Sequence, residues 1–403
     1  MHDVQSFGVV VLVWGVVGSA ALFGRRFARL LRVPAPAVFL IAAVLASTYI
    51  GPVRRSVDLH LVQNVVTLAL VVILFDGGLH LGRRRFRTAA APIVLLGVAG
   101  TFATTALIAV LSHSVFGLDW KFSLVLGAAL APTDPAVVFA VLANKEIQGR
   151  TSAILEGESG CNDPVGIALL LGSVQLATHP HAALVNVLGN FALQMALGVV
   201  FGVAGGRALE WLLAKRPILP AQQPLQAFAG VLALYGLTTV AHGSGFLAVF
   251  LAGIVMGDNQ SASSPVERFH STLASLGEVV AFVMLGLTFQ LHALTIENAW
   301  LIGLGLFAVL AVVIRPLVCV PLLAPVRLSG REVAFVSWAG LKGAVPILLG
   351  VLAVRGGVPD AGRLYAIVFV VVALSVVVQG ASLPLVARRV GIEMRDISDA
   401  DQG

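Results

Sequence analysis

The sequence contains few charged residues and few cysteines. Only 11% of its 403 residues are Asp, Glu, Lys or Arg, and 58% are hydrophobic, whereas soluble domains contain about 25% charged residues. This shortage excludes an ordinary soluble domain. A mean hydropathy of +0.96 instead predicts an all-α polytopic membrane protein. The net charge of +6 does not suggest a nucleic-acid partner. The positions of the charges along the chain instead indicate which segments lie on each side of the membrane.

The two cysteines, Cys161 and Cys319, both lie in apolar stretches. They form neither a disulfide framework nor a metal-ligand spacing, so we interpret each as a small packing residue and expect no cofactor. The N-terminus lacks a basic region and has Asp3 near its start, so we expect no cleavable signal peptide.

Hydrophobic segments long enough to cross a bilayer recur along the chain. A transmembrane helix needs about 20 apolar residues, and we predict about thirteen spans in a single domain over residues 1–391. A short polar cytoplasmic tail, 392–403, is expected to be disordered. The predicted spans are approximately 5–23, 35–51, 62–81, 90–112, 121–143, 151–177, 183–213, 225–241, 245–257, 270–290, 298–324, 332–354 and 364–387.

The basic residues alternate between the two sides of this layout. With the N-terminus outside, nineteen of the 26 Lys and Arg residues fall in inner segments and five in outer segments, while Arg315 and Lys342 remain in the membrane. Positive charges concentrate on the cytoplasmic side of membrane proteins. The distribution therefore predicts an outer N-terminus, a cytoplasmic C-terminus and a cell (inner) membrane location.

Two predicted spans contain residues that interrupt helices. Span 5 contains Ala131-Pro132-Thr133-Asp134-Pro135, and span 12 contains Gly340-Leu341-Lys342-Gly343-Ala344-Val345-Pro346. Proline removes a backbone donor and glycine loosens a helix, so both segments are expected to unwind near mid-membrane. The first six and last six spans would then be two inverted repeats, a pattern typical of a transporter's binding site. The alternative is that the prolines only kink ordinary spans.

The most polar predicted span begins with residues 150–172, RTSAILEGESGCNDPVGIALLLG. Intramembrane carboxylates are costly and usually functional. Helical spacing places Ser159 and Asp163 on one face and Glu158 and Asn162 on a neighbouring face. The alternative is a shorter helix that begins after Glu158 and leaves the first carboxylates in a wet loop.

These residue types suit a monovalent cation and a proton. Hard cations prefer oxygen ligands, and Thr133, Ser159 and Asp163 offer carbonyl, hydroxyl and carboxylate oxygens. The same carboxylate can instead take a proton. If the empty, charged site cannot cross the membrane, the two ions exchange. Because Asn162 beside Asp163 is neutral, we predict electroneutral 1:1 exchange.

The other intramembrane charges are expected to be structural. Glu158 needs a basic partner at that depth; Arg315 and Lys342 are candidates, and Arg315 is favoured for its bidentate fork. Asp134 and Lys342 lie in the two interrupted spans. Half-helix ends carry partial charges of opposite sign, which this carboxylate and this ammonium group can neutralise.

Two further acids lie nearer the predicted cytoplasmic side. Asp76 either lines the entrance and attracts cations or caps the end of span 3. Glu156 lies one turn before Ser159, where we expect Lys145, Arg150 or water as its partner.

Together these motifs resemble the monovalent cation/proton antiporter family, in its bacterial or archaeal sodium/proton exchanger branch with an Asn-Asp ion site. They occur in the family's order and cover nearly the whole chain. The matching segments are Phe75-Asp76-Gly77-Gly78-Leu79, Thr133-Asp134-Pro135, Glu156-Gly157-Glu158-Ser159-Gly160-Cys161-Asn162-Asp163-Pro164, Arg315-Pro316, Ser337-Trp338-Ala339-Gly340-Leu341-Lys342-Gly343-Ala344-Val345-Pro346 and Gln379-Gly380.

The resemblance implies a membrane homodimer that works by an elevator-like movement. Scaffold spans would occupy about 5–81 and 225–290, core spans about 90–177 and 298–387, and a linker helix about 183–213. Spans 5 and 12 would cross, and Asn162 would brace them beside an ion held by Thr133, Ser159 and Asp163. The family commonly has arginine at Lys342.

Two alternative functions use the same residues. An intramembrane serine protease would use Ser159 with His242 as its base, but it leaves Asp163 and span 12 without a role. A cation channel needs an open path with several sites. We therefore expect no enzyme but an antiporter, with Na⁺ favoured and K⁺ or Li⁺ left open.

Overall fold

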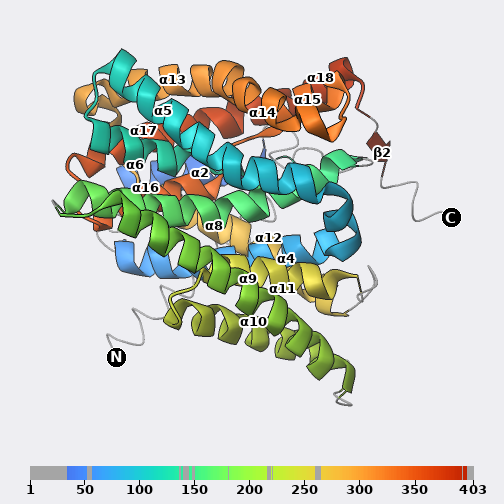
Figure 1. Ribbon diagram of the computed structural model, residues 1–403. Helices are drawn as coiled ribbons and strands as arrows, with labels where there is room; N and C mark the ends of the chain where they lie inside the picture. The colour runs from blue at the N-terminus through green and yellow to red at the C-terminus, as the bar shows by residue number, and fades with distance from the viewer. Residues whose placement is uncertain are drawn as a thin grey trace, which may run out of the picture.

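The computed structural model describes residues 34–51, 57–135, 138, 145–147, 150–179, 181–215, 219, 221–258, 265–392 and 394–396. These residues form long helices that pack side by side (Figure 1). The first predicted span, 5–23, lies outside the described residues.

The helices follow the predicted hydrophobic segments closely. Three π-helical turns join α4 to α5, α13 to α14 and α17 to α18, at Leu95–Gly100, Leu310–Ile314 and Ser375–Gln379, and 3-10 turns lie at Leu291–Asn298 and Ala324–Val326. The α-helices are α2 (Ala35–Tyr49), α4 (Leu59–Val94), α5 (Thr101–Phe116), α6 (Trp120–Leu130), α8 (Arg150–Thr178), α9 (Leu184–Lys215), α10 (Gln223–Val240), α11 (Gly245–Gly257), α12 (Pro265–Leu287), α13 (Ala299–Val309), α14 (Arg315–Leu323), α15 (Gly330–Ala339), α16 (Ala344–Arg355), α17 (Ala361–Leu374) and α18 (Gly380–Val390).

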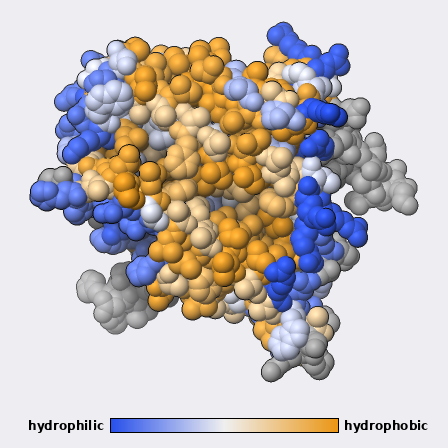
Figure 2. Space-filling view, in the orientation of Figure 1, coloured by the Kyte–Doolittle hydropathy of each residue, from blue (hydrophilic) through white to orange (hydrophobic). Residues whose placement is uncertain are grey.

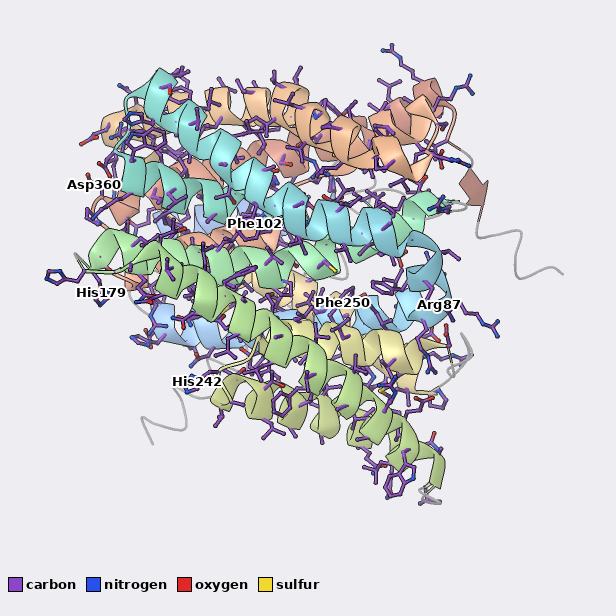
Figure 3. The ribbon with its side chains drawn as sticks, viewed as in Figure 1. Arg87, Phe102, His179, His242, Phe250 and Asp360 are labelled. Atoms are coloured by element: carbon purple, nitrogen blue, oxygen red, sulfur yellow. The ribbon has the colours of Figure 1, made fainter. Side chains whose placement is uncertain are left out.

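The surface has the pattern of a protein that spans a membrane. Figure 2 shows a broad hydrophobic band between two hydrophilic edges. Arg87 lies at one edge, and His179, His242 and Asp360 lie at the opposite one (Figure 3), as the predicted loop layout requires. Among the described residues, five helical segments are long and apolar enough to cross a bilayer, or six if the bent pair α15–α16 is one span. The fold class is thus helical and polytopic, while the count of thirteen stays a prediction.

A glycine kink separates the third and fourth predicted spans. Leu59–Phe116 is one continuous helical segment of 58 residues, but Gly82 inside it has a φ of 58°, a conformation that favours glycine. Asp258 Oδ1 then accepts a hydrogen bond from Arg84 N at 3.2 Å, so the residue that follows α11 caps the helix that starts after the kink.

A short β-ribbon lies outside the helices. Strand β1 (Lys145–Ile147) pairs in antiparallel fashion with β2 (Met394–Asp396), and Glu146 lies opposite Arg395. The expectation of a disordered tail was therefore wrong for these residues, because their backbone groups find partners in the connection that precedes α8.

Helix α8 lies in the interior, where it can position a site. It packs against α4, α6 and α9, and Figure 1 shows it in the middle of the bundle. Its glycines permit this close contact, because a Cβ atom on Gly157, Gly160 or Gly166 would clash with Ile93, Phe250 or Pro132, respectively.

Candidate functional site

The two interrupted spans meet at their unwound segments. Helix α6 ends at Leu130, and residues 132–134 are not helical; α15 ends at Ala339, and α16 begins at Ala344 after a bend of 44°. Asp134 N donates a hydrogen bond to Leu341 O at 2.8 Å. The unwound segments thus satisfy each other's backbone groups in the protein interior, as apolar surroundings require.

Each unwound segment also supplies a charge to the opposite half-helix. Lys342 Nζ donates to Ala131 O at 2.8 Å and to Pro132 O at 2.9 Å, at the carboxyl end of α6. Asp134 Oδ2 accepts from Ala344 N at 3.3 Å, at the amino end of α16. An ammonium group at the negative end and a carboxylate at the positive end both stabilise the helix dipoles. This is the arrangement expected from the sequence.

Polar side chains of α8 clamp the unwound part of span 5. Asn162 Nδ2 donates to Thr133 Oγ1 at 2.7 Å, and Asn162 Oδ1 accepts from Thr133 N at 3.3 Å. Ser159 Oγ donates to Thr133 O at 2.6 Å. All three residues are buried. The structure therefore brings together Thr133, Ser159 and Asn162, and it holds Thr133 in a fixed orientation.

Asp163 lies one position further along the same helix. Its side chain is only 4% exposed, and its Oδ1 atom has no hydrogen-bond partner. The charges that act on it most strongly are those of Asp134 and Lys342. The ammonium group of Lys342 already donates to two carbonyl groups. Asp163 is therefore a buried carboxylate whose Oδ1 atom can still accept a hydrogen bond or bind a cation.

Glu158 and Arg315 form a buried ion pair behind this site. Arg315 Nη1 donates to Glu158 Oε1 at 2.7 Å, and Nη2 donates to Glu158 Oε2 at 3.3 Å and Val336 O at 3.4 Å. Both side chains are at most 4% exposed. Of the two candidate partners of Glu158, Arg315 is the one in contact. Lys342 instead donates to the carbonyl groups at the end of α6. The pair joins α8 to α14, and Val336 O adds α15.

Glu156, nearer the predicted cytoplasmic side, has a partner that the sequence did not indicate. Glu156 Oε1 accepts from Arg85 Nη2 at 3.1 Å and from Ser152 Oγ at 2.8 Å. Arg85 was not among the expected partners, and it reaches Glu156 because the helix after Gly82 turns back against α8.

Asp76 joins two neighbouring helices. Its Oδ1 accepts from Ser271 Oγ of α12 at 2.8 Å and lies 3.4 Å from His80 Nδ1. These contacts fix its position between α4 and α12, and its role at a cytoplasmic entrance stays a prediction.

Sequence reasoning gave no role to two residues that support the second interrupted span. Ser375 Oγ accepts from Lys342 N at 2.9 Å and donates to Gln379 Oε1 at 2.6 Å. Gln379 Nε2 donates to Trp338 O at 3.2 Å. Ser375 and Gln379 are a polar i, i+4 pair in an otherwise apolar helix, and that spacing was the available signal.

In the described part of the chain, the oxygen donors predicted to bind a cation are not accompanied by a cluster of metal-ligating side chains. Among the described residues, no three His, Cys, Asp or Glu side chains lie together as potential metal ligands. Thr133, Ser159 and Asp163 provide only oxygen atoms, which suit a hard cation. The protease interpretation lacks its dyad, because Ser159 donates to Thr133 O and His242 lies at the molecular edge (Figure 3).

Comparisons with known proteins agree with this geometry. The chain matches the family described as sodium/hydrogen exchanger, transmembrane, over residues 17–389. The K(+)/H(+) antiporter NhaP of Alkalimonas amylolytica is 34% identical over 402 residues, with 99% of this chain and 70% of that protein covered. The Na(+)/H(+) antiporter NhaH of Halobacillus aidingensis is 24% identical over 410 residues, with 97% of this chain and 100% of that protein covered.

Among solved structures, the sodium proton antiporter MjNhaP1 of Methanocaldococcus jannaschii at pH 8 has the same fold. It superimposes with a TM-score of 0.77 at 22% identity, and the match covers 92% of this chain and 99% of that one. Fold and family thus define a multi-pass membrane transporter and not an enzyme. The chain belongs to the sodium/hydrogen exchanger family.

Proposed function

We propose that this protein exchanges a monovalent cation for a proton across the membrane. The observation that carries the proposal is Asp163, a buried carboxylate with an unpartnered oxygen among side chains whose charges are engaged. An uncompensated carboxylate costs several kcal/mol in a dry interior. A bound cation or a bound proton removes that cost, so the site favours two loaded states over the empty one.

Thr133, Ser159 and Asp163 would hold the cation. The Thr133 carbonyl and the hydroxyl oxygens keep lone pairs beside their present hydrogen bonds, so they can add ligands without dismantling the clamp. Asn162, Asp134, Glu158, Arg315 and Lys342 would keep the crossing rigid. Since Asn162 is neutral, one carboxylate would alternate between one cation and one proton, which makes the exchange electroneutral.

The cargo is Na⁺ or K⁺, both of which are hard cations that accept this ligand set. Relatives named as K(+)/H(+) antiporters are 34% and 31% identical to this chain, and a relative named as a Na(+)/H(+) antiporter is 24% identical. These names support antiport. Because they include both cations, an assay of this protein should test both Na⁺ and K⁺.

We also propose that the core helices move as a unit against a scaffold. Helix α4 packs on α11 and α12, and α12 packs on α2. Likewise α5 packs on α6, and α17 packs on α13 and α16. This grouping supports the predicted scaffold and core. A homodimer joined through the scaffold, with its N-terminus outside and its C-terminus in the cytoplasm, completes the proposal.

The test is proton movement in proteoliposomes that hold a pH-sensitive dye and an imposed proton gradient. We expect proton efflux on addition of sodium or potassium chloride, unchanged when an ionophore clamps the voltage. Asp163→Asn protein, shown to be folded by gel filtration, is expected to give none. Efflux whose rate changes when the voltage is clamped would contradict the proposal and favour a channel. Efflux that survives in Asp163→Asn protein would also contradict it and favour another site.

A further inference from the structure

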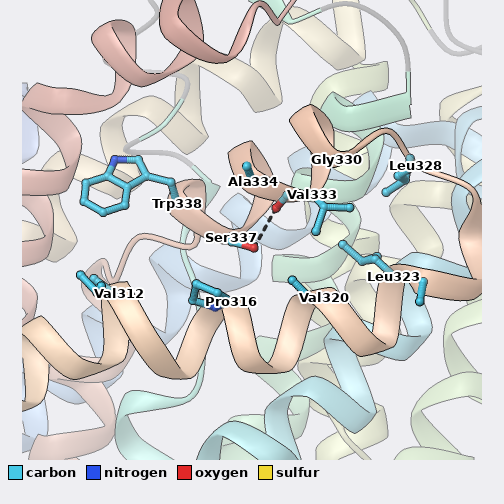
Figure 4. A pocket seen from close by; sticks show the side chains of 12 residues that line it. Val312, Pro316, Val320, Leu323, Leu328, Gly330, Val333, Ala334, Ser337 and Trp338 are labelled. Atoms are coloured by element: carbon cyan, nitrogen blue, oxygen red, sulfur yellow. Dashed lines mark hydrogen bonds between the residues drawn. The ribbon is translucent and has the colours of Figure 1, made fainter.

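A groove outside the ion site runs along the membrane-facing surface between α14 and α15. It has a volume of about 550 Å³, within the range that takes a ligand of a few dozen atoms. Figure 4 shows its two walls, one from the helix that leads into and through α14 and one from α15. The walls include Val312, Pro316 and Val320 on one side and Val333, Ala334 and Trp338 on the other.

The groove offers its occupant a mostly apolar surface. The hydroxyl of Ser337 donates to Val333 O at 2.7 Å, as Figure 4 shows. Trp338 Nε1 donates to Ser382 Oγ at 3.2 Å. Since these polar groups are satisfied within the protein, the groove suits a hydrocarbon chain better than a peptide, whose backbone would need partners.

The length of the groove matches one leaflet of a bilayer. Val312 and Leu323 lie near its two ends, and eleven residues of helix rise about 16 Å. Half of a hydrocarbon core of about 30 Å is about 15 Å. A lipid acyl chain can therefore follow the groove from the membrane surface to the bilayer centre.

Arginines gather at the surface end of the groove. Arg327 lies in the turn between α14 and α15, and Arg331 lies in the first turn of α15; both are exposed. Arg331 Nη1 lies 3.5 Å from where a Cβ atom of Gly391 would be. This contact brings the end of α18, with exposed Arg388 and Arg389, beside the groove.

The carboxylate of Glu332 at this end is already engaged. Glu332 Oε2 accepts from Ser329 N and from Ser329 Oγ, both at 2.8 Å. Arg327 and Arg331 can therefore bind an anion from outside the protein. Clustered basic residues at a membrane surface attract anionic lipid headgroups.

We propose that this groove is a binding site for an anionic phospholipid, with an acyl chain between α14 and α15 and the headgroup on Arg327 and Arg331. The groove walls lead directly to the ion site, because α14 begins with Arg315 and α15 ends next to Gly340. The lipid thus sets the separation between α14, which carries Arg315 of the buried ion pair, and α15, which forms the first half of the second interrupted span.

The test uses Trp338 as a contact probe. The other four tryptophans, Trp14, Trp120, Trp211 and Trp300, are replaced by Phe, and the protein is placed in vesicles of equal parts phosphatidylglycerol and phosphatidylcholine. Bromine is carried on the acyl chains of one lipid or the other. We expect brominated phosphatidylglycerol to quench Trp338 more strongly than brominated phosphatidylcholine.

The headgroup contact is tested by removing its charge. Arg327→Gln/Arg331→Gln is expected to reduce the preference for phosphatidylglycerol by about fivefold for each arginine removed. Arg327→Lys/Arg331→Lys should keep it. The matched control is Arg84→Gln/Arg87→Gln, which removes two exposed arginines from α4 and should change nothing. Equal quenching by the two lipids, or a preference that survives Arg327→Gln/Arg331→Gln, would overturn the proposal.

Discussion

At the residue scale, Glu158, Lys342 and Asp134 are held by an opposite charge or by a half-helix end, whereas Asp163 keeps an oxygen with capacity to accept. Glu158 is neutralised by Arg315, and Lys342 and Asp134 serve half-helix ends. Asp163 Oδ1 has no hydrogen-bond partner. Because an unpaired buried charge opposes folding, its retention in an interior helix indicates that the charge is used in function.

Asp163 and Glu158 of α8 should therefore respond in opposite ways to neutralisation. Asp163→Asn removes an unpaired charge, so we expect a melting temperature equal to or above that of the parent, with exchange lost. Glu158→Gln leaves the Arg315 charge uncompensated, which should cost about 3–5 kcal/mol. Thermal unfolding in detergent measures both. A large loss of stability in Asp163→Asn, with Glu158→Gln unaffected, would reverse the two roles.

At the element scale, the interrupted helices depend on glycine at the point of contact. Gly343 precedes α16, and a Cβ atom there would overlap the carboxylate of Asp134. Gly340 likewise faces the guanidinium group of Arg315. Neither side chain is a free end that can simply move aside, because each already binds a group of the crossing.

Gly343→Ala should consequently displace Asp134 and weaken the amino end of α16. Loss of a helix cap costs about 0.5–2 kcal/mol, and the displaced carboxylate should also impair cation exchange. Gly362→Ala is the matched control, since a Cβ atom on Gly362 in α17 meets nothing within 4 Å. The melting temperature and exchange rate of both variants are compared. Equal melting temperatures and exchange rates in the two variants would show that the contact between the interrupted helices contributes to neither stability nor exchange.

The sequence predicted these interrupted elements because local chemistry determines them. Pro132, Pro135 and the glycines around Lys342 disfavour a continuous helix whatever surrounds them. It did not predict that Glu156 meets Arg85 or that Ser375 supports Lys342. Those contacts depend on how separate helices turn and pack, for example on the positive φ of Gly82, which a linear pattern does not encode.

At the scale of the whole molecule, a few polar contacts bridge the proposed core and scaffold. Thr288, just after α12, and Tyr365 of α17 share a hydrogen bond between their hydroxyl groups. Tyr365 OH also donates to Leu285 O at 3.3 Å. If the core slides against the scaffold, these contacts must break during each cycle.

Cross-linking at this boundary should therefore arrest exchange. In Thr288→Cys/Tyr365→Cys protein, a short reducible bifunctional thiol reagent is expected to abolish cation-dependent proton efflux, and a reductant should restore it. Each single cysteine variant treated in the same way is the control, because it keeps Cys161 and Cys319 but has only one of the two introduced thiols. Undiminished exchange in protein shown to be fully cross-linked would contradict movement at this boundary.

The most direct test of the central claim is proton release on cation binding. Purified protein in weakly buffered detergent solution receives sodium or potassium chloride while a pH indicator reports released protons. If Asp163 is shared between cation and proton, the protein should release one proton for each cation bound, and Asp163→Asn protein should release none. Cation binding without proton release, or equal release from Asp163→Asn, would contradict the account.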